Sequence, residues 1–256
     1  MSPDEPQEGD HLTVAQDPSR PAWLMPVLIV VSTLALIVGV LVTQPGSIGA
    51  DGADGATAPG SPTAEAGVDD GMPDLSEYEA RDPDDLLAEG PVDAPVVMVM
   101  FTDYQCPFCA YWHYRTAPEL RPYVERGDLR IEYRDANVYG KDSERAARAS
   151  LAAAMQGHLR EFQDVMFVDG QIRYSDDLTD DALLEVAAEL GLDVDRFEQD
   201  MNSPEVAQVI DENAQLALDV GATATPMFIV DGGLVVGGQP ADLFIEVIDQ
   251  ALAEAD

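Results

Sequence analysis

Uninterrupted or alternating apolar residues mark four segments of the chain as β-strands. Residues 95–102 contain an unbroken apolar run of strand length, which is typical of a strand buried on both faces. Residues 128–135 alternate apolar and polar side chains, which predicts a second strand. Two shorter apolar runs, 228–230 and 234–236, flank Asp231-Gly232-Gly233, a sequence that favours a hairpin turn. The pattern therefore predicts a sheet that includes a hairpin near the C-terminal end of the chain.

Helical periodicity accounts for most of the remaining folded sequence. In these segments apolar residues recur every three or four positions, as on one face of an α-helix. The predicted order is strand, helix, strand, a block of helices, two strands and a final helix, which is an α/β arrangement. A short helix is also expected over Pro83–Ala88. The longer predicted helices cover residues 107–125, 143–156, 159–168, 180–190, 193–201, 204–220 and 240–255.

The N-terminal region differs from the rest of the chain in its hydropathy. Residues 22–43 form an uncharged apolar run, and a helix of this length spans roughly 30 Å, enough for the hydrocarbon core of a bilayer. We expect a transmembrane helix here. Arg20 precedes the run and no Lys or Arg follows it until Arg81, so residues 1–21 are expected to form a disordered cytoplasmic tail.

A cleaved signal peptide is the alternative to this anchor. Small residues at Ser47 and Gly49 form a candidate cleavage site after the apolar run. The run is longer than the ~7–15 apolar residues of a signal peptide, and no basic segment precedes it. The sequence therefore favours an uncleaved signal anchor, followed by a flexible acidic linker over residues 44–90 and a folded domain over residues 91–256.

Composition narrows the possible functions. The 256 residues include 49 acidic and 13 basic side chains, a formal net charge of −36. Such a surface repels phosphate backbones, so nucleic-acid binding is not expected, and we attribute the acidity to solubility.

Both cysteines lie in one C-x-x-C motif, and the three histidines show no metal-ligand spacing. This pattern favours redox chemistry with no metal and no organic cofactor.

The position of the motif gives the two cysteines different chemistry. Cys106 lies where a predicted strand ends and a predicted helix begins, so the unpaired N–H groups of the helix start favour a thiolate there. Pro107 suits the first helical position. Cys109 comes three residues later, within reach of a mixed disulfide on Cys106. A structural disulfide and a zinc site completed by a second copy of the chain are the alternatives.

Four segments resemble the DsbA-like branch of the thioredoxin superfamily: residues 101–109, 133–135, 143–153 and 221–240. The resemblance covers about residues 91–252. It implies a thioredoxin-like fold with an inserted helical subdomain over about residues 141–202, following the transmembrane helix and linker.

The resemblance also implies a substrate-binding site. Thr225-Pro226 matches the cis-proline of the family, and the backbone of Thr225 would then pair with an extended substrate chain. Phe108, between the cysteines, is expected to be an exposed apolar contact for unfolded substrates.

Two departures from the family concern the chemistry of the motif. Well-studied DsbA enzymes carry His between their cysteines, where this chain has Pro107-Phe108. Many relatives place a buried carboxylate six residues before the first cysteine, where this chain has Met100. Asp103 and Glu132 are weak candidates to replace that acid, since both are expected to be solvated at the surface. His113 is likewise expected to be a partly exposed helix residue.

The sequence as a whole predicts an extracytoplasmic oxidase anchored in the cell membrane by its own helix. The expected substrates are exported proteins with cysteine thiols. By resemblance, the enzyme would be reoxidised by a membrane quinone-linked partner that is DsbB-like or vitamin-K-epoxide-reductase-like. A disulfide reductase or isomerase on the same fold is one alternative. A tethered binding module or chaperone with incidental cysteines is the non-enzymatic one.

Overall fold

The computed structural model describes residues 74–255 of the chain. The expected cytoplasmic tail and transmembrane helix, and residues 44–73 of the expected linker, lie outside the described residues, so the anchor stays a prediction. Within residues 74–255, no helix combines the length and apolar character needed to cross a membrane.

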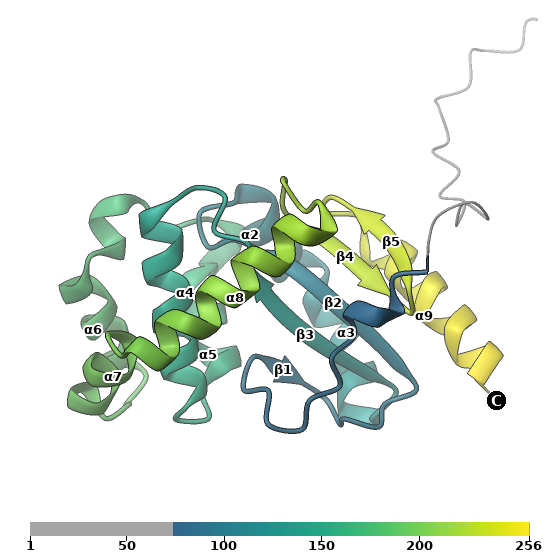
Figure 1. The fold of residues 1–256 in the computed structure, drawn as a ribbon, viewed down its shortest axis with the longest axis horizontal. Helices are drawn as coiled ribbons and strands as arrows, with labels where there is room; N and C mark the ends of the chain where they lie inside the picture. Colours follow the sequence, from purple (N-terminus) through teal and green to yellow (C-terminus); the bar gives the residue numbers. More distant parts are fainter. Residues whose placement is uncertain (1–73, 256) are drawn as a thin grey trace, which may run out of the picture. The chain divides into compact units, whose positions relative to one another are not determined.

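One five-stranded sheet forms the centre of the described fold (Figure 1). The strand order is β1-β3-β2-β4-β5, with β2 and β3 parallel and every other neighbouring pair antiparallel. The two long strands and the hairpin agree with the predicted pattern. The strands are β1 (Ala88–Glu89), β2 (Val96–Thr102), β3 (Leu129–Asp135), β4 (Met227–Val230) and β5 (Gly233–Val236).

The described residues contain eight α-helices. Six of the seven longer predicted helices are confirmed, with ends that differ by a few residues. The helices are α2 (Pro107–Arg115), α3 (Ala117–Arg126), α4 (Lys141–Ala154), α5 (Leu159–Met166), α6 (Asp180–Glu189), α7 (Val194–Met201), α8 (Pro204–Val220) and α9 (Ala241–Ala255).

The predicted helix over residues 107–125 is in fact two helices. Pro118 has no N–H to donate to the turn before it, so the helical ladder is interrupted and α3 begins separately. Thr116 occupies the break, and its hydroxyl donates a hydrogen bond to the carbonyl oxygen of Gln239 at 3.2 Å. This hydrogen bond connects the end of α2 to the loop before α9.

The sheet is covered on both faces, which explains the unbroken apolar run of β2. Met98 and Met100 belong to the core with α2, α3 and α9, whereas Val99 and Phe101 pack in a second cluster with Ala217 of α8. Every residue of β2 is buried. Since successive side chains point to opposite faces, a strand covered on both sides has no polar positions to alternate.

Residues 74–90 are folded onto the sheet, so the predicted linker boundary at residue 90 is wrong. Leu87 is 2% exposed, and β1 pairs antiparallel with β3. The backbone N–H of Leu75 donates to the carbonyl oxygen of Gly232 in the β4–β5 turn, and the carboxylate of Glu79 accepts from the N–H of Gly232. This N-terminal segment therefore contacts the sheet at two places, at β3 through β1 and at the β4–β5 turn.

The expected helix over Pro83–Ala88 is also wrong. The side chain of Asp82 accepts a hydrogen bond from the N–H of Asp84, and that of Asp85 accepts from the N–H of Leu87, both at 2.8 Å. Aspartate side chains that bond to the backbone two residues ahead stabilise turns in competition with a helix. The segment therefore turns twice before entering β1.

The polar residues of β3 are buried in a network of charges. Glu132 is 0% exposed and accepts from Nε of Arg130 at 2.8 Å and from Nη2 of Arg134 at 3.1 Å. It also accepts from the backbone N–H groups of Ala80 and Arg81. The prediction that Glu132 is solvated at the surface is therefore wrong, because the N-terminal segment covers this face of the strand.

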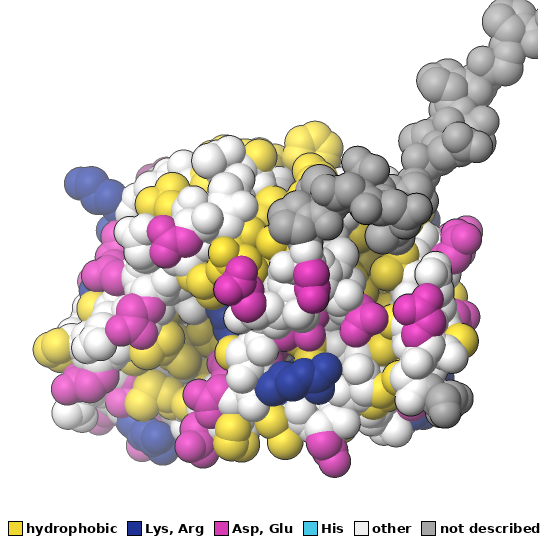
Figure 2. All heavy atoms as spheres, turned by 45° about the vertical axis from the view of Figure 1, so that its right-hand side comes forward, with side chains coloured by type: hydrophobic (Ala, Val, Ile, Leu, Met, Phe, Trp, Pro, Cys, Tyr) yellow, Lys and Arg dark blue, Asp and Glu magenta, His cyan; other side chains and the backbone are white. Residues whose placement is uncertain are grey.

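Acidic side chains are spread over the visible surface, with few basic ones among them (Figure 2). This distribution agrees with the negative charge of the chain. Much of the positive charge that the chain does carry is engaged internally, as in the pairs of Arg130 and Arg134 with Glu132.

Candidate active site

The cysteine motif begins at the N-terminus of α2, as the sequence predicts. Cys106 is the N-cap residue, and its Sγ accepts a hydrogen bond from the backbone N–H of Cys109 at 3.4 Å. Pro107 occupies the first turn of the helix. Both cysteines are free thiols in this structure. The buried strand β2 thus delivers Cys106 to a helix start, where an anion is stabilised.

The environment of Cys106 favours its thiolate. A hydrogen bond from the side chain of Cys109 is the largest of the effects that lower the pKa of Cys106, to about 6. The carbonyl oxygen of Thr225 lies 3.1 Å from Sγ and accepts the S–H of the protonated form. Burial acts in the opposite direction and is outweighed. A thiol with such a pKa is largely ionised at neutral pH and reacts as a nucleophile.

Cys109 has the opposite character. The thiol is buried, and burial raises its pKa well above the ordinary value. Its hydrogen bond to Cys106 and the negative charge of the Cys106 thiolate raise it further, while the hydroxyl groups of Thr102 and Thr225 partly offset these effects. The two cysteines therefore differ in reactivity although they are three residues apart.

We expect the thiolate of Cys106 to form with a midpoint near pH 6. Because the pKa is depressed, the stability that the thiolate adds to the folded reduced form is fully present above the ordinary thiol pKa of about 8.5. This contribution is lost as the pH falls through about 6. The ultraviolet absorbance of the thiolate, followed against pH, measures the midpoint. The Cys106→Ala variant is the control and should lose this step, whereas a wild-type midpoint at the ordinary value would contradict the described environment.

The peptide bond between Thr225 and Pro226 is cis, and it lies beside Cys106. Pairing of Met227 with Phe101 places the start of β4 next to the end of β2, and the residues before Met227 therefore lie against the motif. The structure thus brings together three of the residues singled out in the sequence, Cys106, Cys109 and Thr225.

An exposed apolar surface surrounds the motif. Phe108 is 66% exposed, as expected, and Tyr111 and Tyr139 are about half exposed. The hydroxyl of Tyr139 lies near Cys106, and the pKa of Tyr139 is raised first by burial and then by the negative charge of the Cys106 thiolate. Tyr139 was not anticipated from the sequence because it follows β3, 33 positions after Cys106. Other aromatic residues of this region, such as Trp112, are buried in the core.

Asp103 is buried, so its predicted solvation at the surface is wrong. Its carboxylate accepts hydrogen bonds from the hydroxyl of Ser143 at 2.6 Å and from the N–H of Gln105 at 2.7 Å. Burial raises the pKa of Asp103, and these hydrogen bonds oppose the shift. Asp135, at the end of β3, is also buried, and burial followed by the charge of Asp103 raises its pKa to about 7.

The two acids reach the region of the motif from different elements. Asp103 holds the turn before Cys106, and Asp135 was missed because its burial depends on the pairing of Thr102 with Asp135 across β2 and β3. Met100, which takes the place of the buried acid of many relatives, is a core residue at 2% exposure. The acidic groups near the motif therefore lie on the loop after β2 and at the end of β3.

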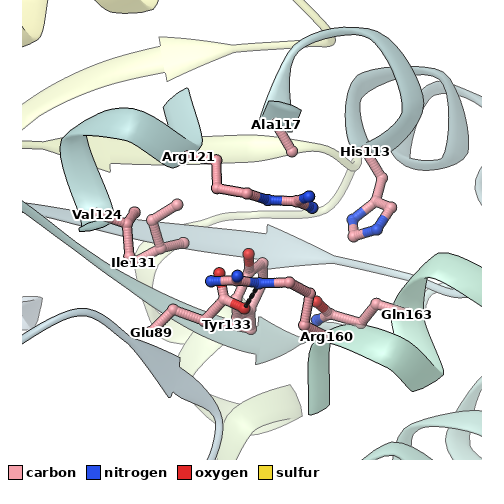
Figure 3. A pocket seen from close by; sticks show the side chains of 9 residues that line it. All are labelled: Glu89, His113, Ala117, Arg121, Val124, Ile131, Tyr133, Arg160 and Gln163. Carbon is pink, nitrogen blue, oxygen red and sulfur yellow. Dashed lines mark hydrogen bonds and ion pairs between the residues drawn. The ribbon is translucent and has the colours of Figure 1, made fainter. Parts of the chain in front are cut away.

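His113 is buried as well, which corrects the expectation of partial exposure. Its Nε2 lies 3.1 Å from Oδ1 of Asp164, and its ring lies 5.3 Å from that of Phe167. Figure 3 shows the small cavity beside it, with the paired Arg160 and Glu89 on the opposite side. The cavity volume of about 10 Å³ is that of a single water molecule. No cysteine lines this cavity, so it does not form part of the motif.

The chain combines a mixed sheet, a C-x-x-C pair at the start of a helix and a cis-proline loop beside that pair. These features define the class of thioredoxin-fold proteins with a thiol–disulfide redox site. The model of the DSBA-like thioredoxin domain family matches residues 97–249. The chain belongs to this family, and the predicted family and thioredoxin-like fold are confirmed.

Three similar proteins show the range of names among the relatives: two are named for disulfide or oxidoreductase chemistry, and one is named as an antiporter. The chain is 27% identical over 150 residues to the probable disulfide bond formation protein D of Bacillus cereus, covering 57% of this chain and 69% of that protein. It is 34% identical over 172 residues to the Na(+)/H(+) antiporter NhaA of Herminiimonas arsenicoxydans, covering 66% of this chain but only 26% of that protein. The crystal structure of a thioredoxin-like oxidoreductase from Silicibacter pomeroyi DSS-3 matches with a TM-score of 0.55 and 30% identity, covering 66% of this chain and 98% of that one.

Proposed function

We propose that this protein introduces disulfide bonds into exported proteins by thiol–disulfide exchange through Cys106 and Cys109. The observation that carries the proposal is the difference between the two thiols, since the pKa of Cys106 is lowered to about 6 while that of the buried Cys109 is raised. A stabilised Cys106 thiolate favours the reduced form of the enzyme and so makes its disulfide an oxidant. The name of the Bacillus cereus relative supports the same direction.

The exchange takes place in two displacements. A substrate thiolate attacks Sγ of Cys106 in the oxidised enzyme, the Cys106–Cys109 bond breaks, and Cys109 leaves and takes up a proton. The second substrate thiolate then attacks the substrate sulfur of the mixed disulfide and displaces Cys106 as a thiolate. The substrate loses two electrons and two protons, and the enzyme is left with two reduced cysteines.

The substrate chain would be held next to the motif by its own backbone and by apolar contacts. Thr225 offers main-chain groups beside Cys106, at the start of β4. Phe108 supplies exposed apolar surface between the cysteines, and Tyr111 and Tyr139 extend it. Such a surface suits unfolded polypeptides with little sequence preference.

The reduced enzyme passes its two electrons to a membrane partner of the quinone-linked DsbB-like or vitamin-K-epoxide-reductase-like type. The apolar run of residues 22–43 supports single-pass anchoring in the cell membrane, with the N-terminus cytoplasmic and the catalytic domain outside. N-terminal sequencing of the protein recovered from membranes tests the anchor. An intact N-terminus is the expected result, and a mature chain that begins near Ala50 would show that the segment is a cleaved signal peptide.

The reduction potential tests the direction of exchange. We expect the Cys106–Cys109 pair to be more oxidising than thioredoxin, at about −270 mV, but weaker than DsbA, at about −120 mV, because Phe108 gives no charge or hydrogen bond to the thiolate. Replacing Phe108 with His should raise the potential by about 30 mV for each tenfold gain in the equilibrium constant of reduction. Equilibration of both proteins with glutathione mixtures gives the two values.

Exposed Tyr111 provides the matched control, since it lies on the same helix outside the motif. Tyr111→His should leave the potential nearly unchanged. A wild-type potential as low as that of thioredoxin would instead favour the reductase alternative, in which electrons flow toward the substrate.

A further inference from the structure

A second concave site lies between the N-terminal segment and helices α4 and α8. It is a groove of about 320 Å³, lined by Ala80, Asp82 and residues 84–87 of the N-terminal segment, and by Arg134, Leu151, Val209, Glu212 and Asn213. This volume falls in the usual range for binding sites of small ligands. No residue of the cysteine motif or of the cis-proline loop lines the groove. In Figure 1 the segment before β1 lies at the lower edge, whereas α2 lies at the upper edge.

The charges around this groove are unbalanced. Four carboxylates line it, and Arg134 is the one basic lining residue. Arg134 is already engaged by Asp85 at 2.8 Å and by Glu132 at 3.1 Å. Among the described residues, the exposed carboxylates of Asp82, Asp84 and Glu212 have no ion-pair partner. The groove therefore presents uncompensated negative charge to a ligand.

A polar side chain in the wall of the groove also has no partner. Asn213 is 8% exposed, and its Nδ2 atom makes no hydrogen bond within the described part of the chain. A buried amide without a partner costs free energy, so this group is expected to meet an acceptor from a ligand or from water. A carbonyl oxygen is the acceptor that a peptide backbone would supply.

The remaining lining is apolar and accessible. Leu86 is 49% exposed and Val209 is 39% exposed, and Leu87 and Leu151 are buried behind them. No cluster of three metal-ligating side chains occurs in residues 74–255, so the carboxylates of the groove do not form a metal site. Spread negative charge beside apolar surface suits a long cation with a hydrocarbon stem, as in lysine and arginine side chains.

We propose that this groove binds an extended polypeptide segment that carries a lysine or arginine next to an aliphatic residue. The cationic head lies among Asp82, Asp84 and Glu212, the aliphatic neighbour packs on Leu86 and Val209, and a main-chain carbonyl accepts from the amide of Asn213. The proposal does not rest on the redox chemistry, since the groove and the cysteine motif share no residues.

Fluorescence anisotropy with labelled peptides tests the proposal on the reduced full-length chain. The probe has the sequence Gly-Leu-Lys-Leu-Gly with blocked ends, and the comparison peptide has Glu in place of Lys. We expect only the lysine peptide to bind. The double variant Asp84→Asn/Glu212→Gln should weaken binding about threefold to tenfold, as expected for the loss of two exposed charge pairs. Asn213→Leu should weaken it independently of ionic strength.

The control variant Glu246→Gln/Glu254→Gln removes the same charge from exposed positions of α9, away from the groove. It should bind the lysine peptide like wild type. Equal weakening in both double variants would show a long-range charge effect and overturn the site. Equal binding of the glutamate peptide would also overturn it, as would a loss of binding in Phe108→Ser alone, which would place the probe at the redox centre.

Discussion

Replacing Cys109 with alanine should trap mixed disulfides between Cys106 and substrate proteins, and replacing Cys106 with alanine should abolish exchange. Cys106 is the N-cap of α2 and has the lowered pKa, so we expect it to be the sulfur that reacts with a substrate. In the Cys109→Ala variant the Cys106 thiolate forms the adduct by attacking a substrate disulfide, whose other sulfur leaves as a thiolate, and no Cys109 thiol is present to attack Sγ of Cys106 and release the substrate. Loss of the nucleophile removes the covalent step and should lower the oxidation rate by about 10³-fold or more.

Non-reducing electrophoresis followed by mass spectrometry of the adducts measures this outcome. The Cys106→Ala/Cys109→Ala protein is the control and should form no adducts. Adducts that appear in Cys106→Ala and join substrates to Cys109 would reverse the assignment of the two thiols. If binding to unfolded chains persists in every variant while no exchange occurs in wild type, the protein is a binding module instead.

Replacing Glu132 with alanine should destabilise the protein by about 3–5 kcal/mol, the cost of removing one partner from a buried ion pair. The substitution leaves the guanidinium groups of Arg130 and Arg134 buried without their shared carboxylate. It also leaves two backbone N–H groups of the N-terminal segment without an acceptor. Urea unfolding followed by circular dichroism gives the free energy of unfolding.

Glu125 provides the comparison for this measurement, because it is exposed on α3. Glu125→Ala should change the free energy of unfolding by no more than about 0.5 kcal/mol, as for most surface substitutions. A similarly small change for Glu132→Ala would show that the network around β3 contributes little to stability. In that case the N-terminal segment would be held mainly by its apolar contacts.

Secondary-structure elements that depend on a few neighbouring residues could be predicted from the sequence. The apolar run of β2, the helix start at Pro107 and the turn between β4 and β5 each depend on residues close together in the chain. Asp231 and Gly232 both adopt positive φ, 49° and 75°, in that turn, as the sequence favoured. The redox pair could be located for the same reason, because a strand end followed by Cys-Pro defines the site almost alone.

The environment of polar residues could not be predicted in this way. Glu132, Asp103 and His113 look like surface residues in sequence, but distant segments bury them. Glu132 is covered by residues about fifty positions earlier, and Asp103 accepts a hydrogen bond from Ser143, forty positions later. The composition of residues 74–90 likewise resembles a linker, and only its pairing with β3 and the β4–β5 turn folds it.

The two-residue strand β1 has a consequence for how the sheet can meet other polypeptides. An uncovered sheet edge adds strands from other polypeptides and seeds aggregation. β1 and the turns before it occupy the outer edge of β3, where Ala88 and Glu89 pair with Glu132 and Ile131. β1 thereby closes this edge to β-augmentation by the unfolded substrates of the proposed function. The main-chain recognition that we propose at Thr225 would instead place a bound strand directly beside a reactive sulfur.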